Sequence, residues 1–567
     1  MNKIKIGIIS LNDFRPWCIS NNWSEILKKE KVLAKTLRIK GFAVIRASRA
    51  KYTAPYPGLK YFTHEIGKVD KRKIGKKLVG PDQTAWRTGL VRTQIDYLIK
   101  QKVKIIIIHQ GDWTWPQRTS EIVTKLSLVK NPPGLIMFSY KDTKVPGLVA
   151  GMAAAGAALR LGRVIDHAFG QPNDQKTLNW LSQLIIKNSQ TSYNPNLVLK
   201  RPSKNPLVNQ EFNIRVKNFK NKAKKIISEN LPNQRALALG TTGCLDMDTT
   251  EIDPVQWRKI FKVGVKQLDQ SAVDELADNL VSWRGKPGES NYQIKDKRAV
   301  ELAQALFKNF KFFEKNKVLE RRIILQIASY LAMRDLFGQH EATFGGIKCQ
   351  DEESAVRVTQ CLGAAYLNND RDIDGTKKQI IPFACENDLD QSLTQILMYL
   401  ISHRVAGFGD FRDVEYEDNF SDKRARLFIV NCGQHPPCYF DGPVEVFKQE
   451  HFYPKAGMAV RGRTPGGLIM TVARLARING QYILVATVME TESVDIAMHN
   501  KYNFSWPIII GKLPPGLAGK EMIALWPSNH LGFTQGDITA ELLAVAKELK
   551  IGYRIFDKKG FEYYQRP

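Results

Sequence analysis

The strongest constraint on the fold is the regular alternation of strand-like and helix-like segments over residues 1–180. Short runs rich in β-branched residues alternate with longer segments whose apolar residues recur at helical spacing. The predicted strands are Lys5–Ser10, Ala43–Arg46, Lys104–His109 and Leu135–Ser139, and the predicted helices are Ser24–Lys40, Ala85–Gln101, Gly147–Leu161 and Gln175–Lys187. This alternation is typical of a parallel sheet covered by helices. No Gly-x-Gly-x-x-Gly pattern follows the first strand, so the sequence does not support a dinucleotide site.

A second α/β region and a β-rich region are predicted further along the chain. Residues 188–210 are rich in Asn, Ser and Pro, which predicts a linker or a surface excursion. The predicted elements beyond it include strands at Ala236–Leu239 and Ile260–Val265, a long helical tract from Asp296 to about Leu336, and several strands with closely spaced glycines after residue 403. The expected fold class is α/β, with two Rossmann-like N-terminal domains followed by a β-rich C-terminal domain. The expected domain boundaries are 1–180, 181–402 and 403–567.

The composition is that of a soluble globular chain, with 43% hydrophobic and 25% charged residues. The N-terminal segment lacks the apolar core of a signal peptide, and no run approaches the roughly 18 apolar residues of a membrane span. Seven scattered cysteines, an odd number, favour free thiols in a reducing compartment. Cys432 and Cys438 flank a segment that matches no zinc pattern and is predicted to be a loop. A cytoplasmic protein without membrane partners is the expectation.

A candidate functional residue lies where one of the later strands meets a helix. The apolar segment before Cys385 predicts a strand, and the apolar residues that recur at helical spacing from Leu389 predict an amphipathic helix. Glu386 therefore lies at the carboxyl end of a strand, where open α/β sheets usually bind ligands. The alternative is that Glu386 only serves the capping of this helix, together with Asn387 and Asp388.

Two further segments present groups of the same chemical kind. Val405–Arg412 predicts a short strand that delivers Asp410 at its end, and Trp526–Gly532 predicts a loop that carries His530. Two carboxylates and one imidazole, each on a loop, form a mostly oxygen ligand set. Such a set suits Mn²⁺ or a similar divalent cation better than a thiolate site does. Their spacing along the chain does not show that these groups meet in space.

These segments resemble the L-fucose isomerase family. The family pattern has Glu-Asn-Asp after a strand, Asp-x-Arg after Ala or Gly, and Asn-His near the C-terminus, and it matches Glu386–Asp388, Asp410–Arg412 and Asn529–His530. Further matches are Gly466–Gly467, Met470–Arg474 and Asn503–Pro507, with looser ones at Val145–Leu148 and Gly240–Cys244. The resemblance covers nearly the whole chain and is strongest from about residue 380 onward.

The resemblance implies a metal-dependent aldose–ketose isomerase that acts through an enediol or enediolate. Glu386, Asp410 and His530 correspond to the family's ligands of Mn²⁺ or another divalent cation, and Glu386 and Asp410 also to its proton-transfer groups. His530 would bind as a neutral ligand through one ring nitrogen, while an acceptor holds the other nitrogen. The implied substrates are L-fucose, D-arabinose or a related aldose. Family members are homohexamers in which the N-terminal domain of a neighbouring subunit completes the active site.

Three residues are weaker candidates for substrate binding. Asn529 is expected to donate to a sugar hydroxyl, and Trp506 to form an apolar wall. Trp113 lies in a loop with Trp115, and this loop either stacks on a sugar or fills a domain or subunit interface, where aromatic residues are common. The interface interpretation is slightly favoured, although a loop of this kind would also serve as a lid over a site in a neighbouring subunit.

The charge keeps a second functional class open. Lys and Arg number 84 against 56 acidic residues, which gives a formal net charge of +28 with clusters at Lys68–Lys77 and Lys217–Lys225. Such a balance favours nucleic acid or another anionic surface. Because no nucleic-acid motif accompanies the charge, a solvated basic surface is the preferred interpretation, and nucleic acid is not an expected partner. The alternative to the isomerase is a basic, non-catalytic protein that binds sugar or nucleic acid on the same scaffold.

Overall fold

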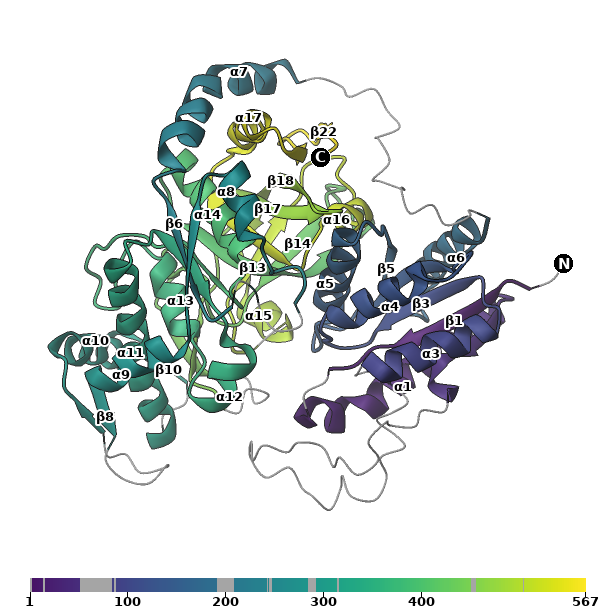
Figure 1. The fold of residues 1–567 in the computed structure, drawn as a ribbon, viewed down its shortest axis with the longest axis horizontal. Coiled ribbons are helices and arrows are strands. Elements are labelled where there is room, and N and C mark those ends of the chain that lie inside the picture. Colours follow the sequence, from purple (N-terminus) through teal and green to yellow (C-terminus); the bar gives the residue numbers. More distant parts are fainter. Residues whose placement is uncertain are drawn as a thin grey trace.

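The chain forms three structural units, which a computed structural model describes over most of the sequence (Figure 1). The described residues are 3–13, 16–50, 84–85, 88–190, 209–241, 243, 247–283, 292–313, 316–449, 455–502 and 504–567. No helix within these ranges is long and apolar enough to cross a membrane. The predictions for the Lys68–Lys77 cluster, for Cys244 and Asn503, and for most of the linker lie outside the described residues.

The first unit is a parallel sheet covered by helices, as the alternation of segments predicts. Its five strands have the order β2-β1-β3-β4-β5. The strands are β1 (Lys5–Ser10), β2 (Ala43–Arg46), β3 (Ile105–Gln110), β4 (Gly134–Tyr140) and β5 (Asp166–Gly170), and the helices are α1 (Pro16–Ile39), α3 (Thr88–Lys100), α4 (Gln117–Ser127), α5 (Gly147–Arg160) and α6 (Gln175–Gln190). All of β3 is buried, because helices pack on both faces of the sheet. Helix α4 and strand β5 were not predicted from the sequence.

The second unit holds another parallel sheet, of four strands in the order β12-β11-β6-β7. Its strands are β6 (Arg235–Leu239), β7 (Gly264–Leu268), β11 (Phe344–Ile347) and β12 (Phe383–Cys385), with a separate hairpin of β8 (Val281–Trp283) and β9 (Tyr292–Ile294). Its helices are α7 (Gln210–Lys225), α8 (Pro254–Ile260), α9 (Ser271–Leu280), α10 (Lys297–Asn309), α11 (Lys317–Gln339), α12 (Ser354–Val356), α13 (Cys361–Asn368) and α14 (Leu389–Ser402). A second α/β unit is thereby confirmed.

Two of the element predictions for this unit are wrong. The predicted strand at 260–265 begins on the last residue of α8 and covers only the first two residues of β7, because Asp253 caps a helix that has a proline at its start. The predicted long helix from Asp296 is interrupted by the two-residue strand β10 (Lys311–Phe312), and Asn316 caps a new helix after it. In both places a capping side chain sets the boundary that hydrophobic periodicity leaves open.

The C-terminal unit is a mixed, mostly antiparallel sheet of eight strands, in the order β17-β20-β13-β14-β19-β18-β21-β22. Because β17 also pairs with β18, six of these strands close into a ring. The elements are β13 (Ala406–Glu415), β14 (Arg426–Val430), β17 (Ile469–Ile478), β18 (Gln481–Glu492), β19 (Ile508–Lys512), β20 (His530–Gln535), β21 (Gly552–Phe556), β22 (Glu562–Gln565), α15 (Ile496–Tyr502), α16 (Gly519–Leu525) and α17 (Thr539–Leu549). The prediction of a β-rich C-terminal part is confirmed.

A small third sheet links the second unit to the C-terminal part of the chain. In this sheet β15 (Glu445–Lys448) is the middle strand and pairs with β10 on one side and β16 (Met458–Arg461) on the other. Strands β15 and β16 therefore pack with the second unit, although they follow the predicted boundary at residue 402. The domain boundaries themselves stay predictions.

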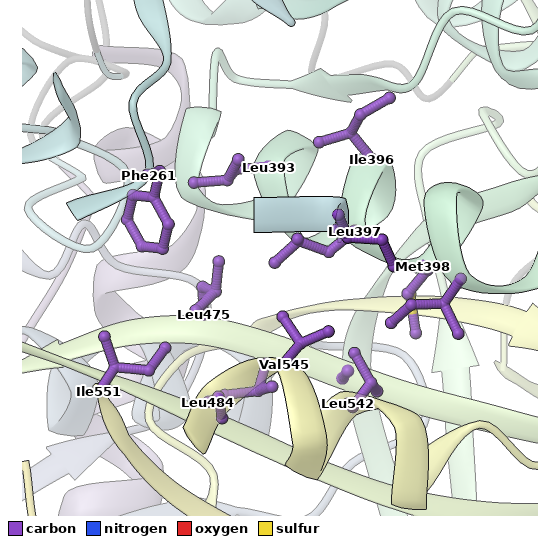
Figure 2. Close-up of a cluster of buried hydrophobic side chains, with 14 of the residues drawn as sticks. Phe261, Leu393, Ile396, Leu397, Met398, Leu475, Leu484, Leu542, Val545 and Ile551 are labelled. Carbon is purple, nitrogen blue, oxygen red and sulfur yellow. The ribbon is translucent and has the colours of Figure 1, made fainter. Parts of the chain in front are cut away.

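Helix α14 fixes the second unit against the C-terminal sheet. Its buried apolar side chains share one cluster with side chains of β17, β18 and α17 (Figure 2). The members drawn there include Leu393, Ile396, Leu397, Met398, Leu475, Leu484, Leu542 and Val545. Burial of each side chain of this size contributes about 1.5–3 kcal/mol. Since α14 begins directly after Glu386–Asp388, this packing holds that segment in place against the strands of the C-terminal sheet.

The first unit also reaches the C-terminal sheet, through α5, which packs against β13 and β17. Gly156 on this helix lies against the carbonyl group of Pro527. A Cβ atom at position 156 would stand 2.2 Å from that carbonyl oxygen, so only glycine permits the approach. The close contact positions the loop that precedes β20.

Four buried histidines make the fold sensitive to acid. Burial lowers their pKa from 6.5, to about 3 in His109, His167 and His435 and to about 4 in His499. In the unfolded chain the histidines regain a pKa near 6.5, so below that pH the unfolded state binds more protons. Their contribution to stability is complete above pH 6.5 and is lost as the pH falls toward 3. Between these pH values each buried histidine lowers the free energy of unfolding by about 1.4 kcal/mol per pH unit.

We therefore expect the melting temperature, followed by circular dichroism, to fall steadily from about pH 6.5 to about pH 5. Replacing His167 with asparagine should make this dependence shallower, because one of the buried titrating groups is gone. Replacing the exposed His403 with asparagine should leave the slope as it is. A melting temperature that stays constant over the whole window would contradict this account of the histidines.

Candidate active site

Asp410 and His530 are brought together by the pairing of two strands. β13 and β20 are antiparallel neighbours, and their register places Asp410 opposite His530. His530 Nε2 lies 3.6 Å from Asp410 Oδ1. The prediction that both residues lie on loops is wrong. β13 continues to Glu415 through a bulge after Phe411, and His530 is the first residue of β20.

Glu386 approaches the same point from the second unit. It follows β12 directly, as predicted, and its Oε2 lies 4.0 Å from His530 Nε2. Glu386 and Asn387 both have left-handed backbone conformations, with φ of 56° and 51°. This conformation costs a non-glycine residue about 1–3 kcal/mol. The strained turn is held by the Asn387 N–H, which donates to the Ile347 carbonyl at 2.9 Å.

Asp388 lies behind His530 and orients its ring. Its Oδ2 is 2.6 Å from His530 Nδ1, and it also forms a buried ion pair with Arg474. Its Oδ1 accepts from Gln391 N at 3.1 Å, which caps α14. From the sequence, Asp388 could either cap the helix or belong to the site. In the structure Oδ1 caps the helix and Oδ2 contacts His530. Because Nδ1 is engaged, Nε2 is the ring nitrogen that faces Glu386 and Asp410.

The pKa values reflect this crowding of acidic groups. Burial alone would raise the pKa of Asp388, but Arg474 and the hydrogen bond with His530 lower it to about 2. Burial raises the pKa of Asp410. Burial would lower the pKa of His530, yet the neighbouring Asp388, Asp410 and Glu386 raise it. The site thus gathers negative charge around one imidazole, which favours a proton or a cation at Nε2.

The donor set matches a hard divalent cation such as Mn²⁺, with two carboxylates and one imidazole nitrogen. Glu386 and Asp410 keep 11% and 22% of their side-chain surfaces exposed, so a small ligand can reach both. Within the described part of the chain, no three His, Cys, Asp or Glu side chains are already spaced to hold an ion. The separations of 3.6 and 4.0 Å from His530 exceed the roughly 3 Å expected between adjacent ligands of an octahedral ion. Binding would therefore draw the three side chains inward.

Of the three weaker candidates, Asn529 contacts a carboxylate of the site, whereas Trp506 and Trp113 have other hydrogen-bonding and packing partners. Asn529 Nδ2 donates to Asp410 Oδ1 at 3.0 Å, and its Oδ1 has no partner among the described residues. The Trp506 ring nitrogen donates to Gln449, and Trp113 packs against Trp115 and Met247. Since Met247 belongs to the second unit, the Trp113–Trp115 loop fills an interface within this chain. A role of either tryptophan in substrate binding stays a prediction.

Three contributors escaped the sequence analysis. Gln350 donates its side-chain N–H to Glu386 Oε1, and Arg474 pairs with Asp388. Arg412, two residues after Asp410, donates to the carbonyl groups of Val145 and Thr143 at 2.9 and 2.7 Å, directly before α5. The signal for Arg412 was present, because the motif match includes it. The match at Met470–Arg474 likewise includes Arg474, although nothing local indicates that its partner is Asp388. Gln350 carries no local signal, since its partner lies far away in the sequence.

Comparison with known proteins adds no assignment, because neither a protein-family model nor a curated protein matches this sequence.

Proposed function

We propose that the chain is a cytoplasmic, metal-dependent aldose–ketose isomerase, with two Rossmann-like units and a β-rich C-terminal unit. The observation that carries the proposal is the convergence of Glu386, Asp410 and His530, from three separate segments, with Asp388 behind the histidine. A scaffold that only binds has no physical need for two acidic side chains around one imidazole. The like charges repel one another unless a cation or a proton lies between them.

Aldose–ketose isomerisation requires few groups beyond these three side chains. An aldose and its ketose differ in the position of a hydrogen on C1 and C2, so a base must remove the C2 proton and return one to C1. Glu386 and Asp410 are the bases that the site offers. A bound divalent cation would polarise the sugar carbonyl and make the C2 proton more acidic. A hydrogen bond from Asn529, whose amide donates to Asp410, to a sugar hydroxyl belongs to the same proposal.

A screen of aldoses in D₂O with Mn²⁺ tests the proposal. We expect L-fucose, D-arabinose or a related aldose to give its ketose, with deuterium at C1, because the proton removed from C2 exchanges with solvent before it is returned. Proton NMR resolves both the ketose and the position of the label. No ketose from any aldose, in protein that is folded and loaded with Mn²⁺, would refute the proposal.

The quaternary structure proposed with this function is a homohexamer, as the family resemblance implies. Light scattering on the purified protein should then give six times the mass of one chain. In such an assembly the Trp113 loop would act as a lid only if it reached a neighbouring subunit. A monodisperse and fully active monomer would contradict the proposed hexamer. It would leave the proposal for the metal site unaffected.

The competing class, a basic nucleic-acid-binding protein, is tested by salt. Of the two basic clusters seen in the sequence, the structure describes the one on α7, with exposed Lys217, Lys220, Lys224 and Lys225. If these lysines are only solvated, duplex DNA should bind weakly at low salt and be released at physiological salt, as measured by fluorescence anisotropy. Sub-micromolar affinity with a base preference at about 0.2 M salt would favour the binding protein over the isomerase.

A further inference from the structure

A pocket opens in the second unit, at the edge of its parallel sheet opposite to Glu386. It lies where the end of α11 meets the amino ends of β11 and β12, and its volume is about 350 Å³. Strands β11 and β12 are parallel, and Glu386 follows the carboxyl end of β12. The pocket is therefore separate from the residues that are proposed to carry out isomerisation.

Arg334 on α11 presents unused hydrogen-bond donors to this pocket. Its Nη1 forms an ion pair with Asp372 and donates to the Tyr330 hydroxyl at 3.5 Å. Its Nε and Nη2 have no hydrogen-bond partner among the described residues, and 34% of the side chain is exposed. These two groups lie along one edge of the planar guanidinium. They match two oxygens of a carboxylate or a phosphate, which makes Arg334 a receptor for an oxyanion.

Lys378 adds a second positive charge to the pocket wall. Its ammonium group is fixed by the carbonyl groups of Leu367, Asn369 and Gln379, to which it donates at 3.1, 2.6 and 3.0 Å. In the part of the chain that the structure describes, no ion pair neutralises it. Burial lowers the pKa of Lys378 to about 8, and the charge of Arg334 also lowers it. An anion beside these two cations would offset both effects.

The remaining lining suits hydroxyl groups on a short carbon chain. The side-chain amide of Gln379 makes no hydrogen bond within the described ranges. Glu341 pairs with Arg235 at 3.2 Å through Oε2 alone, so its Oε1 can accept from a ligand. Phe337 and Ile381 supply an apolar wall. Cationic groups, free polar groups and an aromatic ring thus surround one space.

We propose that this pocket binds a small polyhydroxylated anion, a monosaccharide phosphate or a sugar acid, with its anionic group on Arg334 beside Lys378. Both kinds of ligand share an oxyanion for the guanidinium and hydroxyl groups for Gln379 and Glu341. The volume lies at the small end of the range of about 300–1,000 Å³ that is usual for ligand pockets, and it suits a ligand of this size. The site is independent of the proposed function, because it shares no residue with the metal site.

Calorimetric titration of the full chain tests the binding. The protein is first freed of metal, so that no cation holds a sugar at the candidate active site. The probes are D-ribose 5-phosphate, D-gluconate, inorganic phosphate and D-ribose. We expect ribose 5-phosphate, gluconate or both to bind at one site per chain, at least about tenfold more tightly than inorganic phosphate, and D-ribose not to bind. If neither sugar anion binds more tightly than inorganic phosphate, the proposal is wrong.

Hydrogen–deuterium exchange followed by mass spectrometry locates the bound ligand in the wild-type chain. We expect slower exchange in residues 334–343 and 378–382, which line the pocket, and no change in residues 526–532. Protection confined to the segments around Glu386, Asp410 and His530 would place the ligand in the candidate active site and overturn the assignment.

A charge-conserving variant separates a specific site from general attraction to a chain of net charge +28. Arg334→Lys keeps the positive charge beside Asp372 but removes the planar edge, so binding should weaken about tenfold or more. The matched control is Arg92→Lys, since Arg92 on α3 also pairs with one carboxylate, Glu121, at 3.1 Å. It should bind like the wild type.

Equal affinity of the wild type and Arg334→Lys would show that the anion binds through net charge alone, and would overturn the proposal. Should Arg334→Lys prove unstable by circular dichroism, the exchange pattern of the wild-type chain still decides the location. None of these measurements involves turnover or a metal ion. Failure of the proposed isomerase function is therefore recognised separately, by the aldose screen.

Discussion

Replacing Glu386 with glutamine is expected to lower kcat/KM for isomerisation by about 1000-fold. The change removes a ligand of the divalent cation and a proton-transfer group at once, and each contributes several kcal/mol to stabilising the transition state. The fold should survive, because the strained turn is held by the Asn387 N–H and not by the Glu386 side chain. The melting temperature is expected to stay the same or rise, since one of two neighbouring carboxylates loses its charge.

The matched control for this variant is Glu301→Gln. Glu301 is an exposed residue of α10, so the same chemical change there should leave turnover unaltered. Asp410→Asn and His530→Ala should behave like Glu386→Gln and weaken Mn²⁺ binding. Full activity of Glu386→Gln after thorough chelation and a complete Mn²⁺ titration would remove Glu386 from the site.

The second large effect is expected at Arg474, which is fully buried and pairs with Asp388. Replacing Arg474 with methionine keeps much of the volume but leaves a buried carboxylate without its counter-ion. Breaking a buried pair in this way typically costs about 3–5 kcal/mol of stability. Thermal unfolding followed by circular dichroism should therefore show a clear loss. Turnover should fall as well, because Asp388 can no longer hold the His530 ring with its Nε2 toward the ligands.

The double variant Asp388→Asn with Arg474→Met separates the two effects. Removing both charges should recover part of the lost stability, since no unpaired charge stays buried. It should not recover turnover, because a neutral amide is a poorer acceptor for His530 Nδ1. A single Arg474→Met variant as stable as the wild type would show that Asp388 does not depend on this ion pair.

The hydrophobic periodicity of the sequence predicted the types of most helices and strands but not where some of them begin and end. The four predicted strands of residues 1–180 lie within one residue of β1 to β4, because buried strands between helices carry a strong hydrophobic signal. β5 was missed because Asp166–Gly170 is short and contains His167 at a buried position. The break after α10 was missed because the aromatic residues around β10 fit a helical pattern as well as a strand.

The site was predictable in its chemistry and not in its geometry. Glu386 could be placed from its strand-to-helix junction, which depends only on neighbouring residues. The opposition of Asp410 and His530 comes from the register of β13 and β20, which no local pattern contains.

On the proposed function, one divalent cation, held by Glu386, Asp410 and His530, is required for aldose–ketose isomerisation. The most direct measurement titrates the metal-free protein with Mn²⁺ and follows two signals in the same samples, bound Mn²⁺ by electron paramagnetic resonance and ketose by NMR. The account predicts that no ketose forms without metal, and that both signals rise together to a plateau at one ion per chain. Full isomerisation in the metal-free protein, or Mn²⁺ binding that saturates while no ketose forms from any aldose, would contradict it.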